Sequence, residues 1–439
     1  MYKKNMRRLP DHPYARQGRE PKCKCRRLYS YVGDAEMTDG VKYWIWLQMA
    51  LGYACNVKGI AEEFGSAENL YNSTLRQRTG SGLFSLKKLE KIDNISVDAT
   101  EETIYACRQN GWDIITYDDS RYPDKLRDTD TPPAVLYCDG KFPDFDNYAS
   151  VGMVGTRNAS PYALTVSRLM AHGLAECGAI IVSGGALGVD SAAHTGALDA
   201  NGVTVAVLGC GLGTNYLKKN QRLRRKIKEN GALITEFMPF TKAEKHTFPM
   251  RNRIISGLSD GLFVGEAGEK SGSLITANCA IDQGRDIFVV PSSVLDDRFL
   301  GCNKLIEQGA SVATSPKRIL ECYANKYDTV NLDAARTITE IKNNTFVTGT
   351  GEPKALDSSQ YSFDTITEDR HNHSIKEQQA YALEGNEKLI FDATGDEPAY
   401  IDTISDRAGV DAKHALISMT LLEMKGLVEA LPGKLYKRK

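Results

Sequence analysis

The sequence lacks the cysteine patterns that hold metals or build disulfide frameworks. None of its ten cysteines belongs to a C-x-x-C pair, and the closest two, Cys23 and Cys25, are separated by a single residue with no histidine nearby. Paired zinc ligands are typically spaced by about two to four residues, so metal binding is the weaker interpretation. We expect free, buried thiols in a reducing cytoplasm, no metal centre and no cofactor.

Long apolar runs and an excess of charge are missing as well. No apolar run reaches the roughly 20 residues that cross a bilayer, and no signal peptide opens the chain, so we expect a cytoplasmic protein without a membrane partner. The 55 basic and 56 acidic side chains give a formal net charge of −1. Because no global basic field exists, any site for a polyanion must be local.

Nucleotide-binding signatures are absent or incomplete. The chain has no G-x-x-x-x-G-K-[ST], which argues against an NTP-hydrolysing P-loop. Residues 209–213 (Gly-Cys-Gly-Leu-Gly) look like a dinucleotide fingerprint, but the small-residue helix that should follow is displaced by residues 215–218 (Asn-Tyr-Leu-Lys). No cluster of histidine, cysteine and aspartate has metal-ligand spacing.

The N-terminal part of the chain contains two regions of different composition. Residues 1–40 begin with a stretch rich in Lys and Arg, which predicts a basic disordered tail or, alternatively, a nucleic-acid-binding arm. Residues 41–104 contain short helical patterns around Trp44 and Trp46, typical of a small helical domain. The turn at Gly82 is either a helix-hairpin-helix turn that binds a phosphate backbone or a plain turn between helices.

The C-terminal part also contains two regions of different composition. Residues 323–380 are rich in Asn, Thr, Asp, Ser and Glu without an apolar period, which predicts a flexible linker. Residues 381–439 read as three helices followed by a hairpin, the order of a winged-helix domain. Lys413, His414 and Ser418 fall on its third helix, which carries few basic residues. Binding of DNA and binding of protein by this domain both remain open.

Residues 105–322 form the central domain. After a lead-in with strands near 112–116 and 134–137, helices alternate with short apolar strands at residues 148–154, 179–182, 203–208, 232–235, 261–264 and 286–290. This alternation predicts an α/β fold with a mostly parallel sheet and helices on both faces. The strands lack polar alternation, as expected when both faces of a sheet are buried.

Small glycine-rich turns follow four of these strands. They are residues 155–157 (Gly-Thr-Arg), 183–185 (Ser-Gly-Gly), 209–213 and 271–273 (Ser-Gly-Ser). Ligands of open parallel sheets bind beyond the carboxyl ends of the strands, and a helix N-terminus attracts anions through its unpaired N–H groups. Each turn alone is more simply a helix cap, but several of them on one sheet edge predict an anion site.

Three arginines extend these turns. Arg157 ends the first turn, and Arg251 and Arg253 stand at the start of the helix expected at 251–257. A guanidinium offers a planar fork of donors that suits phosphate oxygens. The turns and the arginines together are therefore predicted to hold an anion.

Catalytic groups are weaker candidates. Asp190 and His194, at positions i and i+4 of one helix, are expected to pair on that helix face rather than to act as a base and its partner. Ser183 follows a strand but lacks the G-x-S-x-G context of a nucleophile. Glu266 closes a strand and is the best candidate for a general acid or base.

The central stretch closely resembles the DNA-processing protein A family (DprA, also called Smf). The resemblance covers about residues 105–322, and the flanking domains match more loosely. Gly213 and Ser292 stand where the family commonly has Asp and Gly. The matching motifs are residues 154–157 (VGTR), 183–194 (SGGALGVDSAAH), 207–212 (VLGCGL), 248–258 (FPMRNRIISGL) and, most specifically, 271–277 (SGSLITA), followed by 284–285 (GR) and 290–291 (VP).

The resemblance implies an extended Rossmann-like fold, an N-terminal domain of the SAM or helix-hairpin-helix kind and a C-terminal winged helix. It implies a protein that is not an enzyme, binds and protects single-stranded DNA, forms a homodimer and loads the RecA recombinase during natural transformation. Tyr162, Tyr216 and Phe248 are candidates for base stacking. The candidate DNA-binding residues are Arg157, Ser183, Gly184, Gly185, Arg251, Arg253, Ser271, Gly272, Ser273 and Thr276, with Lys218 and Arg222 as weaker ones.

An enzyme acting on nucleotides is the alternative. The 183–185 turn and Glu266 also resemble the lysine-decarboxylase-like nucleotide phosphoribohydrolases, which share a Rossmann core and a glycine-rich phosphate turn. Their fuller signature, with a following threonine and a catalytic glutamate, is not evident in this sequence.

Overall fold

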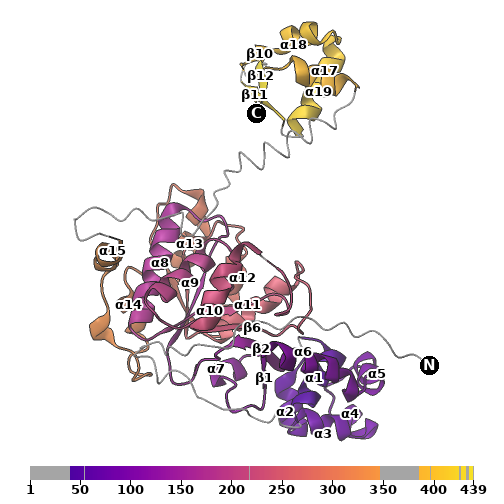
Figure 1. Ribbon diagram of the computed structural model, residues 1–439, viewed down its shortest axis with the longest axis vertical. Helices are drawn as coiled ribbons and strands as arrows, with labels where there is room; N and C mark the ends of the chain where they lie inside the picture. The colour runs from indigo at the N-terminus through magenta and orange to yellow at the C-terminus, as the bar shows by residue number, and fades with distance from the viewer. Residues whose placement is uncertain are drawn as a thin grey trace, which may run out of the picture. The chain divides into compact units, whose positions relative to one another are not determined.

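The chain divides into two compact units, Met1–Thr345 and Phe346–Lys439. Figure 1 shows the elements of both units in the computed structural model. No helix among the described residues is long and apolar enough to span a membrane. The described residues are 40–53, 55–216, 218–346, 385–395, 397–424, 427–431 and 435–438.

The first unit begins with a set of short helices, which we call the N-terminal helices. Trp44 and Trp46 on the first of them are almost fully buried and anchor its core, and this confirms the predicted helical region. A phosphate contact at the Gly82 turn, where φ is +68°, stays a prediction. The helices are α1 (Val41–Leu51), α2 (Val57–Phe64), α3 (Ala67–Asn72), α4 (Leu75–Gly80), α5 (Leu86–Asn94) and α6 (Glu101–Asn110).

A nine-stranded sheet follows, in the order β1-β2-β6-β5-β4-β3-β7-β8-β9. The pairs β1–β2 and β2–β6 are antiparallel and the remaining pairs are parallel, so the predicted mostly parallel sheet is confirmed. The strands are β1 (Asp113–Thr116), β2 (Val135–Gly140), β3 (Ser150–Val154), β4 (Ile180–Ser183), β5 (Thr204–Val207), β6 (Gly231–Thr235), β7 (Gly261–Val264), β8 (Asp286–Val289) and β9 (Ser311–Val312).

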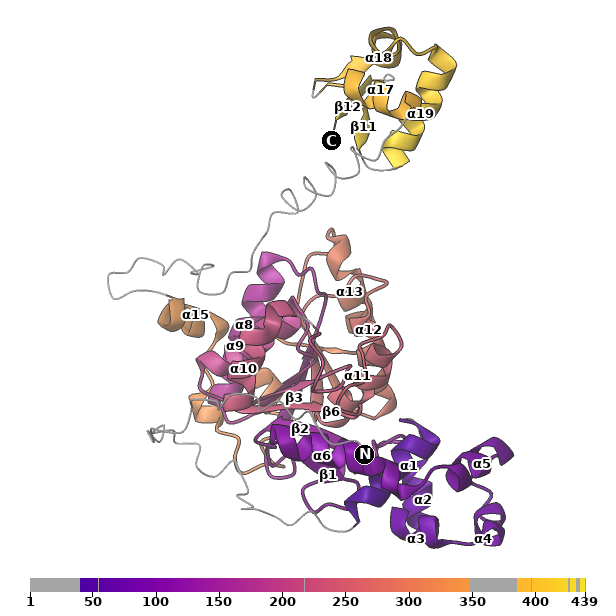
Figure 2. The ribbon, with the colours of Figure 1, turned by 45° about the vertical axis from the view of Figure 1, so that its right-hand side comes forward.

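Helices cover both faces of this sheet, as Figure 2 shows. One face carries α8 (Pro161–Glu176), α9 (Val189–Asp199) and α10 (Gln221–Glu229), and the other carries α11 (Thr247–Gly257), α12 (Ser273–Asp282) and α13 (Leu300–Glu307). The chain runs from β3 outward through β4, β5 and β6, and then returns to place β7 on the other side of β3. Such a reversal of strand order opens a crevice at the carboxyl ends of the strands.

Two short helices and a closing segment complete the first unit. The helices are α7 (Asp124–Arg127) and α14 (Pro316–Leu320), and the segment ends with α15 (Ile338–Phe346). Tyr327 and Ile341 are buried, and Asn331 donates a backbone hydrogen bond to the carbonyl of Cys177. Residues 323–343 therefore pack on the core rather than forming part of a linker, because apolar side chains along this segment are buried in it. Residues 347–384 lie outside the described residues.

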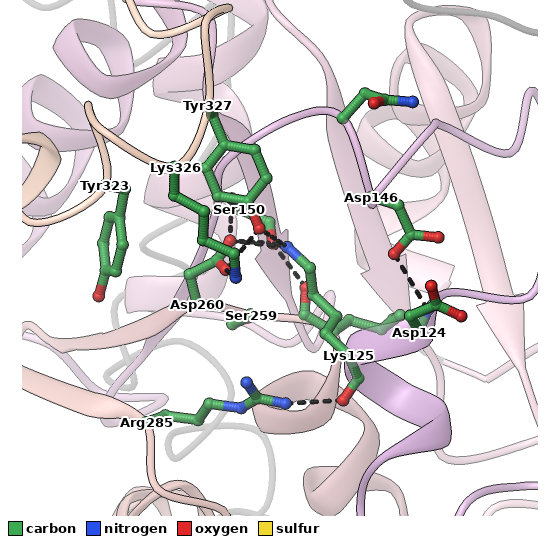
Figure 3. A network of polar contacts seen from close by, with 12 residues as sticks. Asp124, Lys125, Asp146, Ser150, Ser259, Asp260, Arg285, Tyr323, Lys326 and Tyr327 are labelled. Carbon is green, nitrogen blue, oxygen red and sulfur yellow. Dashed lines mark hydrogen bonds and ion pairs between the residues drawn. The ribbon is translucent and has the colours of Figure 1, made fainter.

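A buried polar cluster, which we call the amino-edge network, joins the start of β3 and β7 to this segment (Figure 3). The Lys125 ammonium donates to Asp260 at 2.7 Å, to Ser150 at 2.9 Å and to Tyr327 at 2.9 Å. The other Asp260 oxygen accepts hydrogen bonds from Lys326 and Tyr327. All three ammonium protons of Lys125 thus have partners.

The described residues of the second unit form three helices and a small sheet of order β10-β12-β11. Ile390, Ile404 and Met419 are fully buried in its core, and the predicted winged-helix fold is confirmed. Ser418 is buried rather than exposed on α19, and the Lys413 side chain lies outside the described residues. The elements are α17 (Gly385–Ala393), β10 (Ala399–Tyr400), α18 (Ile401–Ala408), α19 (Ala412–Met424), β11 (Val428–Leu431) and β12 (Leu435–Arg438).

Candidate nucleic-acid interface

A cavity of about 550 Å³ lies where the turns after β3, β4 and β7 meet α11 and α12. It occupies the crevice expected from the reversal of strand order. Its charged lining residues are Arg157, Lys245, Arg251 and Asp190, so cations outnumber carboxylates. The other lining residues are Val154, Gly155, Thr156, Ala186, Phe248, Pro249, Asn252, Ile255, Ser271, Gly272, Ser273, Ile275 and Thr276.

The N-terminus of α12 forms one wall. Ser271, Gly272, Ser273 and Thr276 all line the cavity, as predicted from the 271–273 turn. The hydroxyls of Ser271 and Ser273 lie 2.8 Å apart, and no side chain caps the helix. The N–H groups of Leu274 and Ile275 donate to the carbonyls of Ser271 and Gly272, and the N–H of Ser273 lies 3.4 Å from the Ser271 hydroxyl. The helix N-terminus still carries partial positive charge, so this wall can attract an anion through that charge and bind it through the two hydroxyls.

Arg157 stands at the rim of the cavity. Its side chain is exposed, and its guanidinium carbon lies 5.1 Å from the centre of the Phe248 ring. The Tyr216 ring packs against the same Phe248 ring, with the two ring centroids 5.4 Å apart. A guanidinium in contact with an aromatic ring is attracted to the ring and keeps its planar fork of donors for a phosphate. The arrangement suits a phosphate beside a flat, apolar base.

Arg251 lines the cavity from α11 but is largely buried. It donates to the carbonyl of Gly184 at 2.8 Å and to the carbonyl of Val207. Burial lowers the pKa of Arg251, and the nearby Asp190 carboxylate opposes that effect. Arg251 therefore ties the ends of β4 and β5 to the cavity wall in addition to contributing charge.

The 183–185 turn lies behind the cavity rather than in its lining. The Ser183 hydroxyl donates to the carbonyl of Met153 at 2.6 Å, within the sheet. A side chain at Gly184 would overlap both the Asp190 carboxylate and the Arg251 guanidinium, and Gly185 has a φ of +65° that favours glycine. The turn formed by Ser183, Gly184 and Gly185 thus supports the cavity wall without lining the cavity. Ala186 is the first residue of this turn that lines it.

The remaining predicted cations are not brought to the cavity. Arg253 faces away from it and forms an ion pair with the buried carboxylate of Glu236 at 2.6 Å. Arg222 is exposed on α10 and does not line the cavity, and the Lys218 side chain lies outside the described residues. Among the aromatic candidates, Phe248 lines the cavity, whereas the Tyr162 hydroxyl donates to Pro291 away from it.

Sequence reasoning missed Lys245 and Asn252. Lys245 is exposed in the connection that precedes α11, and Asn252 lies on that helix. The helix begins at Thr247, one turn earlier than the expected start at 251. That earlier start places Phe248, Pro249, Arg251 and Asn252 on consecutive turns of one wall.

The catalytic candidates are occupied by structural contacts. Asp190 and His194 do not pair as expected, because Asp190 accepts hydrogen bonds from the backbone N–H groups of Gly184 and Ala186. His194 contacts Thr204 at 2.7 Å instead, and burial lowers its pKa to about 3. Glu266 is buried and accepts hydrogen bonds from the backbone and hydroxyl of Ser160, at the start of α8.

Known proteins resemble this chain over most of its length. The family model described as DNA recombination-mediator protein A matches residues 113–324, and the one described as DprA winged helix domain matches residues 375–434. Protein Smf of Escherichia coli is 33% identical over 363 residues, which are 82% of this chain and 86% of the relative. DNA processing protein DprA of Bacillus subtilis is 40% identical over 216 residues, 49% of this chain and 73% of the relative.

A solved structure agrees with these relatives. The X-ray structure of DNA processing protein A from Streptococcus pneumoniae aligns with 64% of this chain and 97% of its own, at a TM-score of 0.56 and 32% identity. The alignment extends the sequence similarity to the three-dimensional arrangement of the aligned part of the chain.

Proposed function

The chain belongs to the DNA-processing protein A family (DprA or Smf), and from that premise we propose that it binds single-stranded DNA in the cavity at the carboxyl edge of its sheet. It acts in the cytoplasm without catalysing a reaction, protects the incoming strand and delivers it to the RecA recombinase during natural transformation. Self-association into a homodimer is part of the same proposal.

The observation that carries this proposal is the pairing of Arg157 with Phe248 beside the N-terminus of α12. Arg157, Ser271 and Ser273 offer donors for phosphate oxygens, and the Phe248 ring offers a surface for a base. Phosphate contacts combined with ring stacking are the means by which proteins hold single strands without reading sequence. The strand is therefore bound regardless of its base composition.

The environment of the acidic groups favours binding over catalysis. Glu266 and Asp190 are both buried and engaged with backbone amides. A general acid or base must reach the substrate atom with which it exchanges a proton. No observation on Glu266 favours the phosphoribohydrolase alternative, and release of a base from nucleoside monophosphates would be the result that revives it.

A titration with labelled oligonucleotides tests the binding step. We expect tight binding of single-stranded and weak binding of double-stranded DNA, measured by fluorescence anisotropy over a salt series from about 50 to 200 mM. Each phosphate neutralised on a single strand contributes about −0.7 to the slope of log K against log salt. Equal affinity for both forms of DNA, or a flat salt dependence, would contradict the proposal.

The RecA step requires its own measurement. RecA hydrolyses ATP when it assembles on single-stranded DNA, so the lag before steady hydrolysis reports loading. We expect this protein to shorten that lag, and a variant with Arg157→Ala to do so less effectively. An unchanged lag alongside normal DNA binding would remove the RecA step and leave the binding step standing.

A further inference from the structure

Arg251 and Arg253 lie on α11 and point to opposite sides of it. Two residues two positions apart on a helix differ in direction by about 200°. Arg251 lines the cavity, whereas the Arg253 side chain is 13% exposed and meets the fully buried Glu236 carboxylate. Helix α11 thus has a side that forms the cavity and a side that is anchored elsewhere.

The anchored side of α11 is held by the N-terminal helices. The same Arg253 nitrogen that pairs with Glu236 donates to the main-chain oxygen of Tyr53 at 3.1 Å, two residues beyond the end of α1. From α1 itself, Gln48 donates to the main-chain oxygen of Glu236 at 2.8 Å. The Tyr53 ring packs at 4.7 Å from the Phe237 ring. The end of α1 is therefore fastened both to α11 and to the connection that leads into it.

That connection also belongs to the cavity. It runs from Glu236 to the start of α11 and carries Lys245, which lines the cavity. Its Thr241 hydroxyl contacts the Tyr53 hydroxyl at 3.2 Å, and its Thr241 carbonyl accepts a hydrogen bond from Gly211. A shift of the N-terminal helices would consequently move Lys245, Phe248 and Arg251 together.

We propose that Arg253 is a positioning residue: through Glu236 and Tyr53, the N-terminal helices fix the α11 wall against which the DNA strand binds. This inference rests on the proposed function. It gives the N-terminal helices a role in DNA affinity that needs no contact between them and DNA. It also assigns Arg253 an indirect role in place of the phosphate contact expected from sequence.

The ion pair between Arg253 and Glu236, which we call the anchor, leaves some polar atoms of its two side chains without a hydrogen bond. Neither Glu236 Oε1 nor Arg253 Nη1, both buried, has a hydrogen-bond partner among the described residues. Since a buried charge with unmet donors or acceptors is costly, removing either partner leaves the other without compensation. The position of α11 should therefore respond strongly to changes at this pair.

The pair also responds to pH. Burial raises the pKa of Glu236 to about 7, and Arg253 on α11 partly opposes that rise. The other titratable groups that face the pair include Cys55, just before α2, Tyr122, just before α7, and Cys279 on α12. Above its pKa, Glu236 is charged and attracts Arg253, and below it the carboxyl is neutral. Because the net pKa shift of Glu236 is upward, the stability that this buried carboxyl contributes falls as pH rises through about 7, whereas the attraction to Arg253 exists only in its ionised form.

Three variants test the role of Arg253. Arg253→Met removes the charge, Arg253→Lys keeps the charge without the fork, and Arg168→Met breaks a partly buried 2.7 Å pair with Asp199 on the opposite face of the sheet. We expect the Kd of a labelled single strand to rise about tenfold in Arg253→Met. It should recover in part in Arg253→Lys and stay within about twofold of wild type in the Arg168 control. Thermal melting verifies that each variant is folded.

Two outcomes separate this inference from the proposed function. A folded Arg253→Met variant that binds like wild type overturns the positioning role and leaves DNA binding in place, whereas failure of the wild type to bind overturns the function itself. If Arg253→Met does not fold, Glu236→Gln decides. At about pH 8, above the pKa of Glu236, Glu236→Gln removes the charge that holds Arg253 and should raise the Kd about threefold, and an unchanged Kd would contradict the inference.

Discussion

The two edges of the central sheet both gather charged side chains, but they differ in how those charges are satisfied. In the amino-edge network, Lys125 has three partners and each oxygen of Asp260 accepts at least two hydrogen bonds (Figure 3). At the carboxyl edge, Arg157 is exposed and rests on the Phe248 ring, with no ion pair among the described residues.

This difference distinguishes a charge that holds the fold together from a charge that is available to a ligand. Burial lowers the pKa of Lys125, Lys326 adds to that effect, and Asp260 opposes it. The network keeps this ion pair inside the protein by giving every donor of Lys125 a partner. A saturated group has no donor left for a ligand. Arg157 keeps its donors free beside a cavity. Donors without a partner at a sheet edge therefore indicate a binding site better than the number of charges there.

The largest effect expected from this comparison is on stability. Lys125→Met leaves Asp260 buried with fewer donors, and breaking a buried ion pair costs about 3–5 kcal/mol. We expect a correspondingly lower midpoint in chemical unfolding and an unchanged affinity for single-stranded DNA where the variant is folded. Lys326→Met is the matched control, because Lys326 also contacts Asp260 but is 58% exposed, and should cost at most about 1 kcal/mol.

The opposite outcome is expected at the carboxyl edge. Arg157→Ala should weaken binding by about 1.5 kcal/mol, roughly tenfold in Kd, because it removes a charge-assisted phosphate contact. The salt slope should fall by about 0.7, and the unfolding midpoint should not change. Arg318→Ala, on the exposed side of α14, controls for loss of an arginine. Similar affinities in the two variants would remove Arg157 from the interface.

Much of the fold followed from pattern, because the strands are uniformly apolar and the turns between them carry glycine. The parallel sheet was predicted correctly, and residues 271–276 and Arg157 lie at the carboxyl edge, as expected from the sequence. These features depend on local chemistry, namely an apolar strand, a tight turn and a helix start. The role of residues 271–276 and Arg157 in binding DNA stays a prediction. Membership of the DprA family, indicated by the 271–277 motif, was confirmed as well.

The surroundings of Arg251 and Arg253 depend on helix geometry and on partners far away in sequence. Both arginines lie on one helix, whether it starts at Arg251 as expected or at Thr247 as observed, and side chains two positions apart on a helix diverge by about 200°. Arg253 pairs with Glu236, and Arg251 donates to the carbonyl of Val207. Only the folded sheet brings these distant partners close to the two arginines. No local sequence pattern predicts either contact.

The smallest predicted effect sharpens the comparison within the carboxyl edge itself. Ser271→Ala removes a hydroxyl at the start of α12 but leaves the backbone amides in place, so we expect a loss of about 0.5–1 kcal/mol in binding, or roughly threefold in Kd. Ser315→Ala is the matched control, because the Ser315 hydroxyl caps α14 and its loss should cost about 1 kcal/mol of stability with no change in affinity. If Ser271→Ala instead lowers stability and spares binding, Ser271 is a structural residue of the turn. The carboxyl edge would then bind its anion through Arg157 and the backbone alone.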